Sequence, residues 1–230
     1  APNFDLDGNA TGIVGTLKDI TELKHSEIEL KKSLEKLQMA MNSTIDAMSM
    51  ITESRDPYTA GHQKRVADLA IAIAEEMDLS EERINIIHMA SLIHDIGKIQ
   101  IPAEILVKPG KLSEIEFSMI KSHPEIGYNI LKTVEFTPPI AEIVLQHHER
   151  LDGSGYPKGI TGNEILLESR IIAVADVVEA MASHRPYRPS LGINNALEEI
   201  TRSRGICYDP DVVNACLRIF KEKGFEFKQD

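Results

Sequence analysis

Seven polar residues stand inside or at the ends of apolar, helix-patterned segments, where a soluble protein normally places aliphatic side chains. They are His62, His94, Asp95, His123, His147, His148 and Asp176. The segment LIHDIGKIQIP at residues 92–102 is the clearest example. A buried histidine or aspartate is costly unless it has a partner. One such histidine is usually satisfied by a neighbouring core group, but seven together favour a shared partner, namely bound metal ions.

The chemistry of this set suits two divalent cations. Imidazole nitrogens and carboxylate oxygens are ligands for first-row metals such as iron, manganese, zinc or nickel. Five histidines and two aspartates are more than one tetrahedral site needs, and two neighbouring metals can drive an in-line phosphoryl displacement. We expect Lys98 on the same helical face as His94, one turn later, as a cation aimed at a phosphate. A solvated lysine at a helix end is the alternative.

Two further segments carry residues that suit a nucleotide ligand. In HHERLDGSGYPKG at 147–159, Gly153 and Gly155 indicate a tight turn or a close approach of the backbone to a ligand. Tyr156 is expected to stack on a base or to hydrogen-bond a phosphate. In SHRPYRP at 183–189, Arg185 and Arg188 are candidate phosphate clamps. Structural arginines paired with local carboxylates would explain these two equally well.

The elements that must position these residues are helices. Residues 1–21 contain a turn-prone Asp-Gly followed by a strand-like run. Residues 22–50 read as one long helix with a narrow stripe at alternating spacings of three and four: Leu23, Leu30, Leu34, Leu37, Met41, Thr44 and Met48. This stripe favours a coiled coil over an amphipathic helix packed on its own domain. Beyond it, Ser113 and Glu116 predict a capping box, and the helix that they begin is expected to end near SHPEIG at 122–127.

Composition narrows the class of protein. The 230 residues carry a formal net charge of −11, which argues against a binder of nucleic-acid polymers. The two cysteines form no CxxC motif, so neither a disulfide framework nor a zinc finger is indicated. No apolar run is long enough for a membrane span. The chain opens without a methionine, so we expect a cytoplasmic fragment of a longer protein, in which a membrane-tethered sensor is conceivable.

From about residue 56 to 220 the chain resembles the HD-GYP family, a branch of the HD metal-dependent phosphohydrolases. The resemblance rests on DPYTAGHQKRV, HDIGKIQIP, HPEIG, HHERLDGSGYP, AVADVVEAM and RPYRP in this order. It implies an all-α, HD-type helical bundle that hydrolyses cyclic di-GMP to pGpG and sometimes on to GMP. DGNATGIVGTLKDITELK at 7–24 resembles the end of a PAS domain. The implied division is a PAS-like remnant at 1–21, a coiled-coil signalling helix at 22–52 and an HD-GYP catalytic domain at 53–230.

The resemblance also implies roles for single residues. The seven polar residues match the metal ligands, Asp95 matches the bridging carboxylate, and Lys98 matches the lysine beside the metals. Tyr156, Arg185 and Arg188 match positions that contact the nucleotide. Some family members hold a third metal through a glutamate four residues before the first ligand histidine, where this chain has Tyr58, so we expect two metals. Glu53 and Glu149 are the other carboxylates that could approach.

Several alternatives stay open from the sequence alone. Iron or manganese is the expected metal, with zinc or nickel possible in a purified sample. The substrate could instead be a mixed cyclic dinucleotide or a mononucleotide. The chain could also be a catalytically silent nucleotide-binding module, although all seven matching ligands are present. The coiled coil predicts a homodimer through residues 22–52, driven by an upstream sensor domain.

Overall fold

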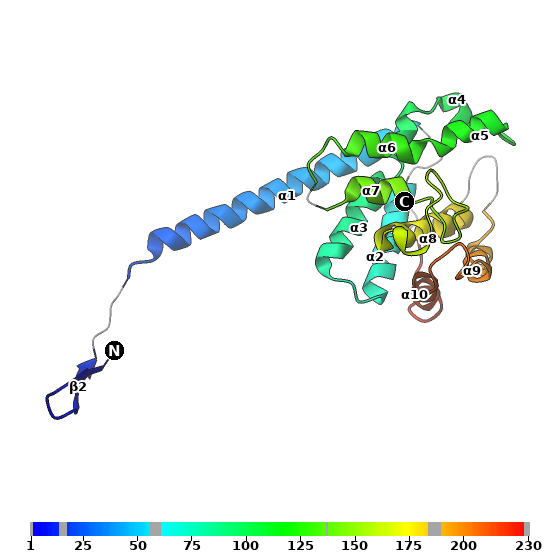
Figure 1. Ribbon diagram of the computed structural model, residues 1–230. Helices are drawn as coiled ribbons and strands as arrows, with labels where there is room; N and C mark the ends of the chain where they lie inside the picture. The colour runs from blue at the N-terminus through cyan, green and yellow to red at the C-terminus, as the bar shows by residue number, and fades with distance from the viewer. Residues whose placement is uncertain (1, 14–17, 56–60, 137, 184–189, 228–230) are drawn as a thin grey trace. The chain divides into compact units, whose positions relative to one another are not determined.

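The structure, a computed structural model, describes residues 2–13, 18–55, 61–136, 138–183 and 190–227 (Figure 1). The chain divides into two compact units, Ala1–Asn42 and Ser43–Asp230. This division falls within the long helix α1, Thr21–Arg55. Tyr58, Arg185 and Arg188, which the sequence analysis singled out, lie outside the described residues.

The first unit contains a small antiparallel hairpin and the first part of α1. Strands β1 (Pro2–Phe4) and β2 (Ala10–Ile13) pair with Pro2 opposite Ile13. The turn between them forms because the Asp5 carboxylate accepts hydrogen bonds from the backbone N–H groups of Asp7 and Asn9, at 3.0 and 2.8 Å. Asp19 accepts from the Thr21 N–H at 2.9 Å where α1 begins. The turn, the strand after it and the long helix were predicted from the sequence, whereas strand β1 before the turn was not.

The second unit is built from helices. In chain order they are α2 (His62–Glu76), α3 (Glu81–Ile93), the 3-10 helix η1 (Ile96–Gln100), α4 (Ala103–Leu106), α5 (Glu114–Lys121), α6 (His123–Leu131), α7 (Ile140–Gln146), the 3-10 helix η2 (Gly162–Glu164), α8 (Leu167–Ala182), α9 (Ile193–Arg202) and α10 (Pro210–Lys221). Helix α2 packs against α3, α8 and α10, and α6 packs against η1 and α7. The predicted all-α bundle is therefore confirmed.

The core of this unit follows the helical periodicity of the sequence. Val66, Leu69, Ala70 and Ile73 recur at the spacing of one α2 face, and all four are completely buried. Completely buried aliphatic side chains also come from α3, α7 and α8, among them Ile87, Ile143, Ile171, Ile172 and Val178. Burying one such side chain stabilises the fold by about 1.5–3 kcal/mol, so the apolar contacts hold the helices that surround the polar residues.

One helix was not predicted from the sequence. The capping box of Ser113 and Glu116 begins α5, which ends at Lys121 near SHPEIG as expected, but the chain breaks only briefly there and a second helix, α6, begins at His123. The reason is Pro124, which has no N–H to donate and would clash with the carbonyl of Ile120 in a continuous helix. The Nδ1 atom of His123 donates to that carbonyl instead, at 2.7 Å. The break therefore places a histidine ring where a helical hydrogen bond would have been.

Among the described residues, no helix combines the length and the apolar character that a membrane crossing requires.

Candidate metal centre

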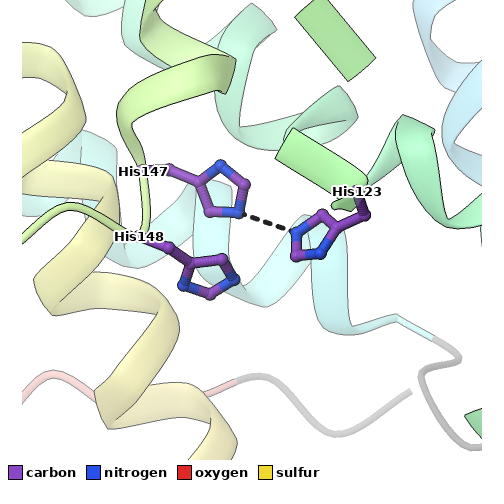
Figure 2. A group of neighbouring side chains, drawn as sticks. All are labelled: His123, His147 and His148. Atoms are coloured by element: carbon purple, nitrogen blue, oxygen red, sulfur yellow. Dashed lines mark hydrogen bonds between the residues drawn. The ribbon is translucent and has the colours of Figure 1, made fainter. Parts of the chain in front are cut away.

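The seven polar residues predicted to act together lie together in the second unit. His62 begins α2, His94 and Asp95 follow the last residue of α3, and His123 begins α6. His147 and His148 follow α7, and Asp176 lies in α8. Figure 2 shows the rings of His123, His147 and His148 turned toward one another. Possible ligand atoms lie within 4.8 Å of one another in three groups: His123, His147 and His148; His62, His94 and Asp176; and His94, Asp95 and His147.

The ends of helices orient three of these histidines. The last carbonyls of a helix have no partner within the helix. The Nδ1 atoms of His94, His123 and His147 donate to the carbonyls of Ser91, Ile120 and Val144, at 2.7, 2.7 and 2.6 Å. In each case the carbonyl lies three residues before the histidine. Because Nδ1 carries the proton, the Nε2 atom of a neutral ring offers its lone pair to the cluster.

The inward nitrogens lack satisfactory partners in the protein. His94 Nε2 is buried and has no hydrogen-bond partner. The Nε2 atoms of His123 and His147 lie 3.2 Å apart (Figure 2, dashed line), and two lone pairs at this distance need a shared proton or cation. Burial lowers the pKa of His123 to about 4, and burial beside other histidines lowers the pKa of His147 well below its usual value. A proton is therefore unfavourable there at neutral pH, and a metal ion fits.

The two aspartates supply negative charge to the cluster. Asp95 Oδ1 lies 3.3 Å from His123 Nε2, and its Oδ2 lies 3.5 Å from His94 Nε2. Burial alone would raise the pKa of Asp95, but the Lys98 ammonium, 2.6 Å from Oδ2, and the nearby histidines hold that pKa well below its usual value. Asp176 Oδ1 lies 3.3 Å from His62 Nε2. Both carboxylates are thus ionised at neutral pH and face histidine nitrogens, which is the chemistry of a cation site.

Lys98 lies at the edge of the cluster, where its ammonium could contact a bound phosphate. The sequence placed it one α-helical turn after His94, whereas α3 ends at Ile93 and Lys98 belongs to the 3-10 helix η1. In this 3-10 helix the Lys98 ammonium lies 2.6 Å from Asp95 Oδ2, and the Lys98 side chain is 15% exposed. Oδ2 of Asp95 therefore faces both the Lys98 ammonium and His94, while Oδ1 faces His123.

The loop after His148 brings Tyr156 against the cluster. The Tyr156 ring centroid lies 4.7 Å from that of His148. A Cβ atom at Gly155 would come within 2.4–2.5 Å of backbone atoms of residues 148–150, so only glycine fits there. Gly153 has a φ of 79°, a conformation that favours glycine. Both glycines thus fold the loop back on itself beside the histidines.

Two buried polar residues near the cluster, Glu179 and Gln63, were not assigned a role from the sequence, whereas Glu149 and Glu53 were named there as carboxylates that could approach. Glu179 contacts His62, and Gln63 donates to Asp95 Oδ2 at 3.4 Å. Glu149 accepts from the backbone N–H groups of Lys158 and Gly159, at 2.6 and 3.2 Å, so it braces the tyrosine loop. Glu53 likewise accepts from the backbone where α2 begins. The signal for Glu179 was available, since it lies one turn after Asp176 on an apolar helix.

Comparisons with known proteins agree with this geometry. A family model described as HD domain matches residues 46–212. The cyclic di-GMP phosphodiesterase response regulator RpfG of Xanthomonas campestris is 43% identical over 194 residues, which cover 84% of this chain and 51% of RpfG. A cyclic di-GMP phosphodiesterase of Thermotoga maritima is 45% identical over 182 residues, covering 77% of this chain and 49% of that protein. The chain thus spans about half the length of these curated relatives.

Solved structures show the same fold. An HDGYP protein of Bdellovibrio bacteriovorus, Bd1817, superposes with a TM-score of 0.59 at 18% identity, covering 70% of this chain and 51% of Bd1817. The HD domain of the Listeria monocytogenes phosphodiesterase PgpH in complex with cyclic di-AMP gives a TM-score of 0.55 at 19% identity. That match covers 80% of this chain and all of the PgpH domain. The chain therefore belongs to the HD domain family, in its HD-GYP branch.

Proposed function

We propose that this chain is a metal-dependent phosphodiesterase that hydrolyses cyclic di-GMP to pGpG, with further conversion to GMP left open. The observation that carries the proposal is the buried cluster, in which three histidines held through Nδ1 turn their Nε2 atoms toward neighbouring histidines and ionised aspartates. The tyrosine loop beside this cluster supports a nucleotide ligand. The relatives named for cyclic di-GMP support the choice of substrate.

The proposed ligands of two divalent cations, iron or manganese, are His62, His94, Asp95, His123, His147, His148 and Asp176. Such cations, when bound, supply activation of water and neutralisation of charge on the phosphodiester. Asp95 is proposed to supply the negative charge shared by the cations, since one of its oxygens faces His94 and the other faces His123. Its partner Lys98 is placed to stabilise the negative charge that develops on the phosphate.

The substrate contacts are proposed from position and side-chain chemistry. Tyr156 offers an aromatic face 4.7 Å from the His148 ring, which suits stacking on a guanine. Gly153 and Gly155 let the backbone of the same loop approach the nucleotide. Arg185 and Arg188 are proposed from the sequence to clamp phosphate. These residues would hold the ring of a cyclic dinucleotide with one phosphodiester over the cations.

A mixed cyclic dinucleotide is the second candidate substrate. A relative of this chain is named 3'3'-cGAMP-specific phosphodiesterase 3, from Vibrio cholerae, and is 38% identical over 167 residues. These cover 73% of this chain and 36% of that protein. Hydrolysis of cyclic di-GMP and of 3'3'-cGAMP, each alone and then in competition, separates the two candidates. The preferred substrate is the one with the higher kcat/KM.

The first test joins metal content to hydrolysis. Chain loaded anaerobically with iron or with manganese is expected to hold about two metals and to convert cyclic di-GMP to pGpG. His94→Ala removes a ligand that two of the three groups share, and is expected to lower metal content and to abolish turnover. Metal bound by the wild type without hydrolysis of either cyclic dinucleotide would contradict the proposed activity. Metal absent after every loading would contradict the proposed centre.

We infer in addition that the catalytic domain, 53–230, follows a signalling coiled coil, 22–52, and a PAS-like remnant, 1–21, of a cytoplasmic sensor protein. Leu23, Leu30, Leu34 and Leu37 support a homodimer, since these side chains are 57–69% exposed along one stripe of α1. A second copy would cover this stripe by coiled-coil packing. The upstream sensor would then act on the enzyme through the paired helices.

Charge placed on that stripe is expected to separate the dimer. The double substitution Leu30→Glu and Leu34→Glu introduces like charges at a seam that two chains share, so light scattering after size exclusion should change from dimer to monomer. Ile28→Glu is the matched control, because Ile28 is 52% exposed on the same helix but lies off the stripe. A wild-type chain that is monomeric at micromolar concentration, or a double variant that stays dimeric, would contradict the coiled coil.

A further inference from the structure

We propose that Glu179 is a positioning residue for His62, and that it sets the affinity of one of the two metal sites. The inference rests on the proposed metal centre and extends it to a residue that need not touch either the metal or the substrate. Glu179 lies on α8, one turn after Asp176, and is 1% exposed. Its whole side chain is thus committed to contacts within the protein.

Both oxygens of the Glu179 carboxylate accept hydrogen bonds. Oε2 accepts a hydrogen bond from His62 Nδ1. Oε1 accepts from Arg65 Nε at 2.8 Å and from Ser183 Oγ at 2.6 Å. These donors come from the first turn of α2 and from the residue that ends α8. Three donors fix the position of both carboxylate oxygens, and a fixed acceptor holds the ring that it contacts.

His62 needs this carboxylate because of its place in the fold. The rings of His94, His123 and His147 each donate Nδ1–H to a backbone carbonyl three residues earlier. His62 is the first residue of α2, so no preceding turn of that helix provides a carbonyl. Glu179 takes the place of that carbonyl. With Nδ1 committed to Glu179, the other ring nitrogen, Nε2, faces Asp176 Oδ1, 3.3 Å away.

A divalent cation bound here would take the place of the Nε2 proton and be held by the ring nitrogen and the carboxylate together. His62 Nε2, Asp176 Oδ1 and a nitrogen of His94 form one of the groups with possible ligand atoms within 4.8 Å. A carboxylate behind a ligand histidine raises the basicity of the ring and fixes its orientation, and losing such a partner costs about 10–100-fold in metal affinity. The site of His62, His94 and Asp176 should therefore depend on Glu179, whereas the site of His123, His147 and His148 should not.

The competing explanation is a buried ion pair that only joins α2 to α8. Glu168 provides a matched control for it, since it lies on the same helix and accepts from Arg83 Nε and Nη2 of α3, at 2.8 and 2.6 Å. Glu168→Gln removes the charge of a helix-joining pair without touching a histidine of the cluster. Glu179→Gln removes the charge behind His62 with no change in side-chain size.

The test is a calorimetric titration of the metal-free chain with Mn²⁺. In Glu179→Gln we expect one of two binding events to weaken by about 10–100-fold while the other keeps its affinity. Glu168→Gln should titrate like the wild type. The visible spectrum of the chain loaded with Co²⁺ gives a second readout, expected to change in Glu179→Gln alone. Ser183→Ala, which removes one hydrogen bond and no charge, should weaken the same event by less than about 10-fold and serves if Glu179→Gln does not fold.

The outcomes separate this inference from the proposed function. Glu179→Gln or Ser183→Ala that binds both equivalents with wild-type affinity would overturn the positioning role and leave the proposed activity standing. Equal losses in Glu179→Gln and Glu168→Gln would also overturn it, because they would indicate a role in stability alone. A wild-type chain that binds no Mn²⁺ would overturn the metal centre itself, and this inference with it.

Discussion

Asp95→Asn is expected to lower the hydrolysis of cyclic di-GMP by more than about 100-fold and to reduce the metal content of the chain. Even an outer partner of a metal ligand is worth about 10–100-fold, and Asp95 lies inside the cluster. Asn keeps the shape of the side chain but removes the negative charge that faces His123 on one oxygen and His94 on the other. The measurements are metal content by mass spectrometry and the initial rate of pGpG formation.

Asp46→Asn is the control for this substitution, because Asp46 is exposed on α1 and loses the same charge. It is expected to keep wild-type metal content and rate. Far-UV circular dichroism of the metal-free proteins should show both variants folded. An Asp95→Asn variant that retains two metals and a rate within a few-fold of the wild type would contradict the role proposed for this carboxylate.

Gly97→Ala is expected to destabilise the catalytic unit by about 3 kcal/mol or more, the upper range for overpacking a core. A Cβ atom at Gly97 would lie 1.9 Å from the His123 carbonyl oxygen and 2.7 Å from the Gly127 nitrogen. Both are backbone atoms of α6, so the only relief is to move η1 away from α6. That movement separates Asp95 from His123, and metal should be lost together with stability. Denaturant unfolding of the metal-free and metal-loaded proteins measures both effects.

Gly127→Ala tests the same contact from the other side and should cost far less. A Cβ atom there would meet the side chains of Val144 and Ile96 at 3.0 and 3.3 Å, and these side chains can shift. The gain of about 1 kcal/mol in helix propensity from glycine to alanine also offsets part of the cost. Equal destabilisation by the two substitutions would show that the backbone contact of Gly97 is not the cause.

The sequence predicted the helices and the cluster for the same reason, namely that burial follows periodicity. Val66, Leu69 and Ile73 mark the buried face of α2, and His62 stands on the extension of that face. Polar residues on such faces had to meet in the interior. The contact of α2 with α8, which brings Asp176 to His62, is a tertiary contact that local patterns do not encode.

What the sequence missed has physical reasons as well. Pro124 predicted the end of α5. It did not predict that the Ile120 carbonyl, left without a helical partner, would accept a hydrogen bond from the His123 ring. Glu179 has the residue type of an ordinary solvated side chain, and its burial depends on Arg65 and Ser183 closing over it. Gly97 gave no turn signal. The space for a side chain at this position is closed by the backbone of α6 at His123, 26 residues later in the chain, and a local pattern does not show such a contact.

The hydrogen bonds between three histidine rings and the carbonyls three residues before them have a consequence for how such a protein can vary. Each ring takes its direction from the last turn of the helix that precedes it, so the direction in which it points is a local property. One residue added inside α3 would rotate His94 by about 100° relative to the core, since a helix has 3.6 residues per turn. The same residue added to the connection at 107–113, between α4 and α5, would leave every ring in place. Insertions during evolution should therefore accumulate between the helices, while the lengths of α3, α5 and α7 stay constant.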